Sequence, residues 1–347
     1  MPTPRFLLPA ILSFACASPT LAEQRRDLSG VTPESLAGVI SALPEQRAVQ
    51  GGEAYIEGLR ATEDWLIEQL EGFGYKVQTQ EVRYVPHRRA RGGEGREVVV
   101  TRNIWADLPG SQTPDEVVIF SAHFDAVPGS PGANDNGSGV AAVLEGARVL
   151  AGEPAPRTIR FMFFTAEEFG LIGSRQYVAQ VLTPKLESGE ERFIGCVNLD
   201  VMGYYSDEPG SQRHPRGFPG DPDAPGDFVA VLSFAAQADF LREVATGMRR
   251  AEPEVKILST EFLPLPLPDM MRSDHAPFWN AGLPAVHLTD TANFRYDHYH
   301  RSTDTLDKLN LPVYAQVSRA AIGAVVHLAS PESPQERDAE DDAGANR

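Results

Sequence analysis

The sequence contains few cysteines and no long apolar segment. Among its 347 residues there are two cysteines, Cys16 and Cys196. This number excludes a disulfide framework and a cysteine-rich zinc module. Because no run of 18 or more apolar residues occurs, we expect no ordinary membrane-spanning helix.

Positive charge is also scarce. There are 31 lysines and arginines against 48 aspartates and glutamates, which gives a formal net charge of −17. Nucleic-acid-binding proteins normally carry a basic surface, so we expect no nucleic-acid partner, and anionic membrane surfaces are disfavoured for the same reason. The hydrophobic content of 42% and the charged content of 23% are typical of a globular chain that folds around a sizeable core.

Both ends of the chain differ from its middle. Residues 1–22 predict a signal peptide, since Arg5 precedes the apolar stretch 6–17 and the small residue Ala22 ends a plausible cleavage site. We therefore expect a secreted or periplasmic protein. Residues 331–347 contain no aromatic or β-branched side chain and predict a disordered acidic tail.

The residues between the ends alternate between apolar runs and amphipathic segments. Expected strands cover 76–84, 98–107, 116–122, 158–165, 193–199, 255–260 and 284–289, and expected helices cover 53–73, 139–150, 174–181, 235–251 and 311–329. Residues 87–97 are expected to form an exposed hairpin loop, and 206–228 a long Gly- and Pro-rich surface loop. This order predicts one α/β domain over 23–330, a three-layer sandwich with a mixed, mainly parallel central sheet.

Polar side chains follow several of the expected strands, at the edge where ligands bind in such sheets. The candidates are His123, Asp125, Asp135, Glu167, Glu168, Asp200, His298 and His300. Each alone has an ordinary explanation, such as a helix cap at Asp135 or a packed core histidine at His123. The adjacent carboxylates Glu167 and Glu168 at the end of a buried strand are harder to explain, because each raises the pKa of the other unless a cation lies nearby.

Taken together, the candidates suit a metal centre. Histidine, aspartate, glutamate, aspartate and histidine recur in this order, and five ligands are too many for one ordinary zinc ion. They suit two divalent ions, about 3.5–4 Å apart, that share a bridging carboxylate. Imidazole with carboxylate oxygens favours zinc, and the spare glutamate of the pair would act as a general base.

The sequence resembles the secreted di-zinc aminopeptidases of peptidase family M28 over roughly 59–328. The resemblance lies in Ser-Ala-His-Phe-Asp at 121–125, Gly-Ala-Asn-Asp-Asn-Gly-Ser-Gly at 132–139, Ala-Glu-Glu-Phe-Gly-Leu-Ile-Gly-Ser at 166–174, Asn-Leu-Asp at 198–200, Ser-Asp-His-Ala-Pro-Phe at 273–278 and Tyr-His-Arg-Ser-Thr-Asp-Thr at 299–305. It implies the zinc-exopeptidase fold and two zinc ions. It assigns no role to Asp274 or His275 in the fifth motif.

The resemblance also implies which ion each ligand holds. His123 and Asp200 match the ligands of one zinc, Glu168 and His300 those of the other, and Asp135 matches the bridge. His300 is preferred to its neighbour at position 298 because it fits the Tyr-His-x-x-x-Asp pattern.

Three further expectations come from the same resemblance. Glu167 matches the general base, Asp125 would orient the ring of His123, and the peptide bond from Asp135 to Asn136 is expected to be cis. The implied reaction is hydrolysis of a peptide bond by a water molecule that the metals acidify.

The implied substrate is a peptide with a free N-terminus, whose ammonium group suits an acidic site. Phe294, Tyr296 and Tyr299 are candidates for an apolar pocket that takes the substrate side chain. We expect the protein to act as a monomer without a membrane span.

Other activities stay open at this point. Carboxypeptidases and dipeptidases of the same family need a cation that binds the substrate carboxylate, and Arg272, Arg295 and Arg301 lie near the site motifs. Related glutaminyl cyclases use one zinc for acyl transfer. A non-catalytic binding domain on this fold is a further alternative, although such relatives typically lose metal ligands.

Overall fold

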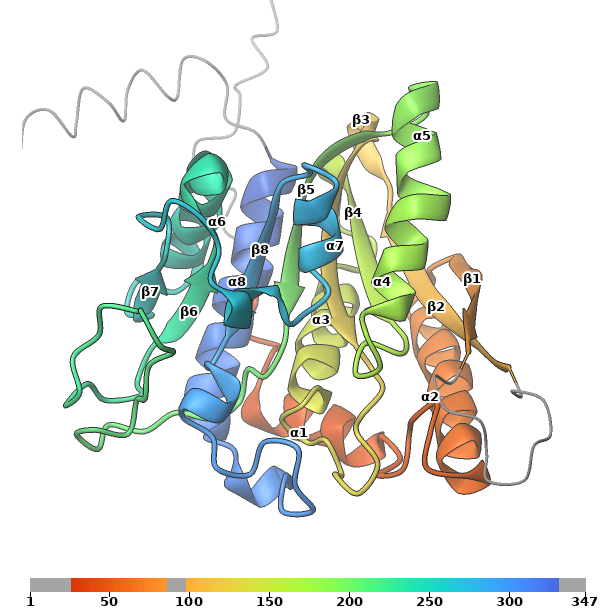
Figure 1. Cartoon of the computed structure of the whole chain (residues 1–347). Helices are drawn as coiled ribbons and strands as arrows, with labels where there is room; N and C mark the ends of the chain where they lie inside the picture. The colour runs from red at the N-terminus through yellow and green to blue at the C-terminus, as the bar shows by residue number, and fades with distance from the viewer. Residues whose placement is uncertain (1–25, 86–97, 331–347) are drawn as a thin grey trace, which may run out of the picture.

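The computed structural model describes residues 26–85 and 98–330. The predicted signal peptide 1–22, the predicted hairpin loop 87–97 and the predicted tail 331–347 lie outside these residues. The described chain forms an eight-stranded sheet with the order β1-β2-β4-β3-β5-β8-β6-β7 (Figure 1). Its strands are β1 (Val77–Tyr84), β2 (Val99–Leu108), β3 (Gly110–His123), β4 (Ala155–Phe164), β5 (Arg192–Leu199), β6 (Val229–Leu232), β7 (Ile257–Ser259) and β8 (Ala285–Thr289).

The sheet is mixed, as the sequence predicts. The central strands β4, β3, β5 and β8 are parallel to one another, and β6 is parallel to β7. Antiparallel pairs occur between β1 and β2, between β2 and β4, and between β6 and β8. Because the four central strands run the same way, their carboxyl ends meet at one edge of the sheet.

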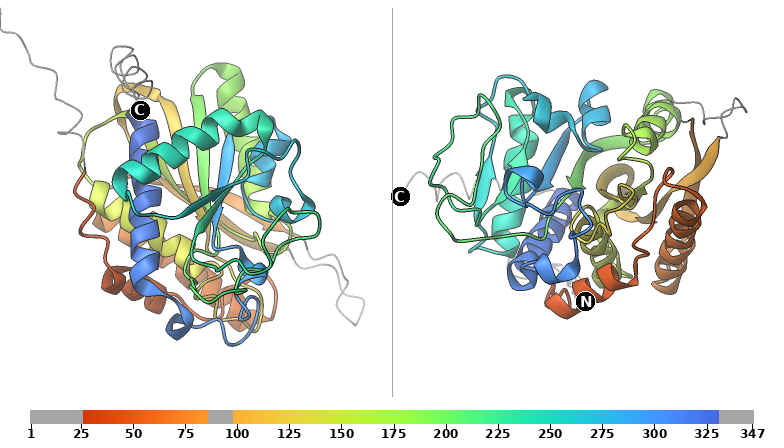
Figure 2. Two further views of the ribbon diagram at one scale, coloured as in Figure 1. Left: turned by 90° about the vertical axis from the view of Figure 1, so that its left-hand side faces the viewer. Right: turned by 60° about the horizontal axis from the view of Figure 1, so that its bottom comes forward.

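Helices cover both faces of the sheet (Figure 2). They are α1 (Pro33–Ala42), α2 (Glu53–Gly72), α3 (Gly137–Leu150), α4 (Ile172–Tyr177), α5 (Thr183–Ser188), α6 (Ala238–Ala251), α7 (Ala276–Asn280) and α8 (Leu311–Ala329). Alternate residues of a strand point to opposite faces. In β3, Val118 and Phe120 pack in the cluster that contains α1, α2, α3, α6 and α8, whereas Val117 and Ile119 pack in the cluster that contains α4, α5 and α7. The predicted three-layer sandwich is therefore confirmed.

Several element boundaries differ from the predictions. Helix α1 was not expected, although Thr32 and Ser35 form a reciprocal capping box at its start and Pro33 occupies its first position. Strand β3 begins at Gly110 rather than at residue 116, because Gly110 and Thr113 also pair with β4. The helix expected over 174–181 is instead α4, a π-helical stretch (Val178–Leu182) and α5. Pro184 lacks the N–H group that would continue regular α-helical bonding through this stretch.

None of the helices in the described part of the chain has both the length and the apolar character needed to cross a membrane.

Candidate metal centre and active site

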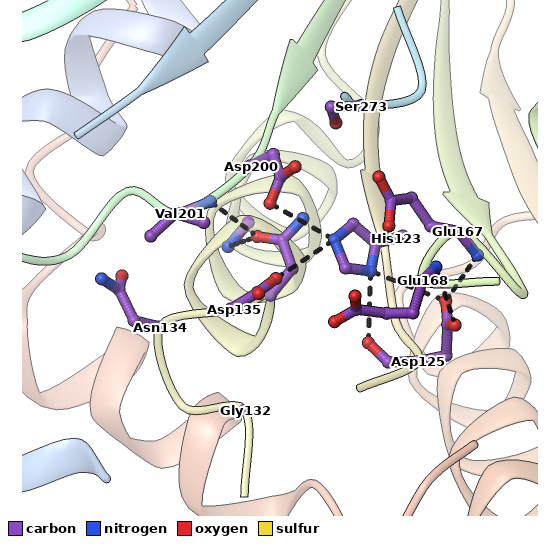
Figure 3. Close-up of polar contacts among 12 residues, drawn as sticks. His123, Asp125, Gly132, Asn134, Asp135, Glu167, Glu168, Asp200, Val201 and Ser273 are labelled. Carbon is purple, nitrogen blue, oxygen red and sulfur yellow. Dashed lines mark hydrogen bonds and ion pairs between the residues drawn. The ribbon is translucent and has the colours of Figure 1, made fainter. Parts of the chain in front are cut away.

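Most of the candidate ligands lie where the central strands end. His123 is the last residue of β3, Asp200 directly follows β5, and Glu167 and Glu168 come soon after β4. His300 lies in the loop between β8 and α8. The structure thus brings together side chains from four separate parts of the chain (Figure 3 shows all of these except His300).

The polypeptide backbone turns sharply beside several of these ligands. Ala166, Val201 and His300 have φ angles of 53°, 58° and 59°, in the left-handed region that non-glycine residues rarely adopt. The first two each neighbour a carboxylate of the site, and the third is itself a candidate ligand. Such conformations cluster at functional sites. The peptide bond between Asp135 and Asn136 is cis, as the resemblance implies.

Two groups of potential metal ligands result. The first contains His123, Glu167 and Asp200, and the second contains Asp135, Glu168 and His300. Within each group the potential ligand atoms lie within 4.8 Å of one another. The sequence predicts Glu167 to be a base rather than a ligand, and its carboxylate lies within 4.8 Å of potential ligand atoms of His123 and Asp200.

Asp135 connects the two groups. Its Oδ1 atom lies 3.4 Å from Nε2 of His123, and its Oδ2 atom lies 2.9 Å from Nε2 of His300. Asp200 Oδ1 is 3.3 Å from the same nitrogen of His123, and Glu168 Oε2 is 3.1 Å from that of His300. One carboxylate therefore faces both imidazoles, which is the arrangement required of a bridging ligand.

Asp125 connects His123 to the two glutamates. Its Oδ1 atom lies 3.6 Å from Nδ1 of His123, and its backbone oxygen lies 3.2 Å from the same nitrogen. The two carboxylate oxygens also accept hydrogen bonds from the backbone N–H groups of Glu167 at 3.0 Å and of Glu168 at 3.3 Å. Asp125 is fully buried, and it contacts the ring of His123 and the backbone of both glutamates at once.

The protein groups alone leave the site with strongly shifted pKa values. Burial, together with the charge of Asp135, raises the pKa of Glu168 to about 8. Burial also raises the pKa of Glu167 well above its usual range. Burial opposes protonation of His300, but hydrogen bonding to Asp135 and Glu168 outweighs it and raises the pKa of His300 to about 10. The two neighbouring glutamates thus bind protons strongly in the absence of a cation.

The residues fit a pair of zinc ions. Glu168 Oε1 is a buried carboxylate oxygen that accepts no hydrogen bond, and Asp135 Oδ2 has only the imidazole nitrogen of His300 beside it. Such atoms are costly unless a cation or a donor satisfies them. Imidazole nitrogens with carboxylate oxygens are a donor set that suits zinc, and two divalent ions would compensate the four negative charges of Asp135, Glu167, Glu168 and Asp200.

Arg47, which the sequence did not single out, holds the loop between β3 and α3. Its buried guanidinium donates hydrogen bonds to the carbonyl oxygens of Phe124, Pro131 and Gly132, at 2.6–2.8 Å. It also donates to the carbonyl oxygen of Pro44 at 2.8 Å. The loop that it closes carries Asp125 and Asp135, so Arg47 positions these side chains from outside the motifs.

Other residues named in the sequence lie outside the ligand groups. His298 contacts Thr303 Oγ1 at 2.8 Å, so the preference for His300 agrees with the geometry. His275 stacks on His287 with ring centroids 4.6 Å apart and belongs to the packed core. Asp274 is fully buried, which raises its pKa to about 7, and its charge contributes to the raised pKa of Glu167.

A cavity adjoins the metal centre, because Asp200 forms part of its wall. Its volume is about 770 Å³ including the open mouth. Phe294 and Tyr299 line this cavity, as expected. The third aromatic candidate, Tyr296, is wrong for this role, because it is fully buried and donates its hydroxyl to Asp304 at 2.7 Å.

The sequence matches a known family. A sequence model described as "Peptidase family M28" matches residues 103–325. An uncharacterized Escherichia coli protein, YfbL, is 29% identical over 324 residues, which cover 90% of this chain and 92% of that one. The aminopeptidase YwaD of Bacillus subtilis is 32% identical over 219 residues, which cover 60% of this chain and 40% of YwaD.

Solved structures share the fold. An aminopeptidase from Aneurinibacillus sp. strain AM-1 superposes with a TM-score of 0.64 at 19% identity, over 89% of this chain and 97% of that one. A glutaminyl cyclase from Fimbriiglobus ruber gives a TM-score of 0.61 at 21% identity, over 86% of this chain and 95% of that one. Since an aminopeptidase and a glutaminyl cyclase share this fold, the fold alone does not distinguish between their two activities.

Proposed function

The chain belongs to peptidase family M28, and on that premise we propose that it is a zinc-dependent aminopeptidase that hydrolyses N-terminal residues from peptides. The observation that carries the proposal is the position of Asp135, whose two carboxylate oxygens face His123 and His300. A bridging carboxylate between two imidazoles is what a two-metal hydrolytic centre requires.

We propose that His123 and Asp200 hold one zinc ion and that Glu168 and His300 hold the other, with Asp135 between them. Two bound zinc ions would acidify a water molecule and polarise the substrate carbonyl. The two ligand groups and the buried acceptor oxygen Glu168 Oε1, which has no donor, support this assignment.

Glu167 is proposed as the general base. Its carboxylate lies close to the proposed ligands His123 and Asp200, and the hydrogen bond from its backbone N–H to Asp125 holds its backbone in place. In the reaction, Glu167 takes a proton from the attacking water and returns it to the amine that leaves. Bound cations would keep Glu167 ionised, since they offset the burial that raises its pKa.

The cavity beside Asp200 is proposed to take the side chain of the N-terminal residue. Its apolar lining includes Phe218, Leu232, Leu258, Leu267 and Met270. The acidic groups around the centre favour a free substrate ammonium over a blocked amine, which agrees with an aminopeptidase.

Hydrolysis of a substrate panel tests the proposal. The panel contains aminoacyl-arylamides, their N-acetylated forms, peptides with a free carboxyl end and blocked amino end, and an N-terminal glutaminyl peptide to detect cyclisation. Each is assayed with and without a chelator, and with Glu167→Gln. The matched control is Glu68→Gln, which changes an exposed glutamate of α2.

We expect cleavage of the free-amine substrates only, and we expect the chelator to abolish it. In Glu167→Gln, kcat should decrease about 10²- to 10⁴-fold. The control variant should retain the wild-type rate. Cleavage of the N-blocked peptides would instead identify a carboxypeptidase, and cyclisation without hydrolysis would identify a glutaminyl cyclase. No reaction from protein that binds two zinc ions would contradict the proposed activity.

We also propose that the protein acts outside the cytoplasm as a monomer. The predicted signal peptide over 1–22 supports the first part. Sequencing the amino terminus of the mature protein tests it, and a start at Glu23 is expected. Sedimentation of the zinc-loaded protein tests the second part.

A further inference from the structure

The cavity beside the metal centre contains one permanent positive charge. Among the described residues that line it, Arg272 is the only lysine or arginine. Most of the other lining side chains are apolar or neutral, and the acidic ones are Asp200, a proposed zinc ligand, and Asp269. The arginine is the exception in this wall, because the apolar lining would suit an apolar substrate side chain without it.

The other two arginines that the sequence raised are not available to a substrate in this cavity. Arg295 is 3% exposed and donates to Gln212 Oε1 at 2.9 Å and to the carbonyl oxygen of Phe228 at 2.9 Å. It is a structural cation that closes the loop between β5 and β6. Arg301 is exposed and does not line the cavity.

The guanidinium of Arg272 is held in place by neutral groups. It donates to Asn293 Oδ1 at 2.9 Å and to the hydroxyl of Tyr299 at 3.1 Å, and it lies over the Tyr299 ring at 5.7 Å from the ring centroid. Its contact with Asp269 is longer, at 3.4 Å, and both side chains are 42% exposed. Such a solvated pair contributes little. Because arginine has five N–H donors, Arg272 keeps donors for a further acceptor.

Arg272 also lies close to the proposed reaction centre. The ring of Tyr299 stacks on the ring of His300 with centroids 3.8 Å apart and an interplanar angle of 18°. One aromatic ring therefore separates the guanidinium from a proposed zinc ligand. These two separations together come to less than about 10 Å, the length of three extended residues, so Arg272 lies within reach of the first residues of a substrate held at the metals.

We propose that Arg272 is a specificity residue that binds a substrate carboxylate, either on the side chain of an acidic N-terminal residue or at the carboxyl end of a dipeptide. This inference rests on the proposed aminopeptidase function and names its substrate class. A planar guanidinium held on one edge presents its other donors to both oxygens of a carboxylate. The fixed orientation on Tyr299 reduces the entropy lost when the substrate binds.

Two pairs of substrates distinguish the sources of the carboxylate. Glutamyl and glutaminyl arylamides differ by one charge at nearly constant shape, and so do Leu-Gly and its C-terminal amide. We would measure kcat/KM for both pairs with wild-type protein, Arg272→Met, Arg272→Lys and the control Arg301→Met. Zinc content and thermal melting of each variant verify that the metal centre and fold are intact.

We expect the wild-type protein to prefer the acid in at least one pair, and Arg272→Met to reduce that preference about 10- to 100-fold, the range for a hydrogen bond to a charged group. Arg272→Lys should recover part of it, since the charge remains without the planar fork. A change in the glutamyl pair identifies a side-chain carboxylate, and a change in the dipeptide pair identifies the carboxyl end.

Two results would overturn the inference. One is hydrolysis with the same acid-to-amide ratios in wild-type protein and Arg272→Met, and the other is a ratio that changes in Arg301→Met instead. Both differ from failure of the proposed function, in which none of the four substrates is cleaved in a chelator-sensitive reaction.

Discussion

The side chain of Asp304 accepts a hydrogen bond from the backbone N–H of Asp135, at 3.1 Å. Its other oxygen accepts hydrogen bonds from the backbone N–H of Asn134 at 2.8 Å and from the hydroxyl of Tyr296 at 2.7 Å. Asp304 therefore joins the loop of the proposed bridging ligand to the loop that carries His300. Two members of the second ligand group, Asp135 and His300, are far apart in sequence, and this one carboxylate joins their loops.

Asp304→Asn should weaken zinc binding. In the variant, one carboxylate oxygen is replaced by an NH₂ group, which can only donate. This group would face the backbone N–H of Asn134 or of Asp135, and the contact between two donors would displace the Asp135 loop. We expect the affinity for zinc to fall about 10- to 100-fold, as for other residues that orient metal ligands. Titration of the metal-free protein against a competing chromophoric chelator measures this. Asp307→Asn, an exposed carboxylate of the same loop, is the control, and equal affinities for both variants would refute the prediction.

Replacement of Arg47 should destabilise the loop that carries Asp125 and Asp135. Arg47→Met removes a donor from four backbone carbonyl oxygens, of which that of Gly132 keeps the N–H of Gly137, and we expect a loss of about 3 kcal/mol in the free energy of unfolding. Urea denaturation measures this loss, and Arg60→Met, at an exposed position of α2, serves as the control. If Arg47→Met and the wild-type protein have the same urea midpoint, these hydrogen bonds contribute nothing to the free energy of unfolding.

Removal of the metal should destabilise the protein as well as inactivate it. A ligand that binds only the folded state, at a free concentration 100-fold above its Kd, adds about 2.7 kcal/mol to stability. We expect the melting temperature to fall on dialysis against a chelator and to recover with zinc. Chelator already saturated with zinc is the control. An unchanged melting temperature, with zinc loss shown by elemental analysis, would contradict the prediction.

A buried ion-pair network far from the metal centre gives a prediction about pH. Arg160 of β4 is 2% exposed and donates to Asp107 and Glu191, at 2.8 Å each. Burial opposes ionisation of Glu191, but Arg160 and Lys185 outweigh it and lower its pKa. The stability from this group is therefore present above its ordinary pKa of about 4.5 and is lost as pH falls through its lower folded value.

Arg160→Met leaves both carboxylates without this partner, and we expect a cost of about 3–5 kcal/mol at pH 7. The difference from wild type should shrink as pH falls below about 4.5 toward the lower folded pKa of Glu191, because the unfolded chain takes up its proton first. Chemical denaturation at pH 7 and pH 4 measures both values. Arg175→Met, at an exposed position of α4, is the control, and a difference that grows in acid would show that the sign is wrong.

Much of the fold follows from the sequence because its central strands are continuous apolar runs. The segments around Phe120 and Phe161 are buried on both faces, so their composition alone marks them as strands. The exact boundaries of some elements are harder to predict. The π-helical stretch before Pro184 and the early start of β3 at Gly110 depend on backbone pairing, which leaves no hydrophobic pattern.

The candidate ligands could be found because each lies beside a recognisable motif or strand end. Arg47 could not, because it acts on backbone carbonyl oxygens at Phe124, Pro131 and Gly132, which carry no residue-type signal. The same holds for the choice among the three arginines. Only their burial and partners separate Arg272, in the cavity wall, from Arg295, which closes a loop.

The cavity wall and the candidate metal ligands come from different kinds of structure. The ligands mostly lie at the ends of packed strands, whereas much of the wall comes from surface loops over 206–228, 260–272 and 291–299. Loops accept substitutions and insertions more readily than packed strands do. Descendants of such a chain can therefore change their substrate specificity while keeping the same reaction. A laboratory that wished to retarget this protein would randomise the loops first.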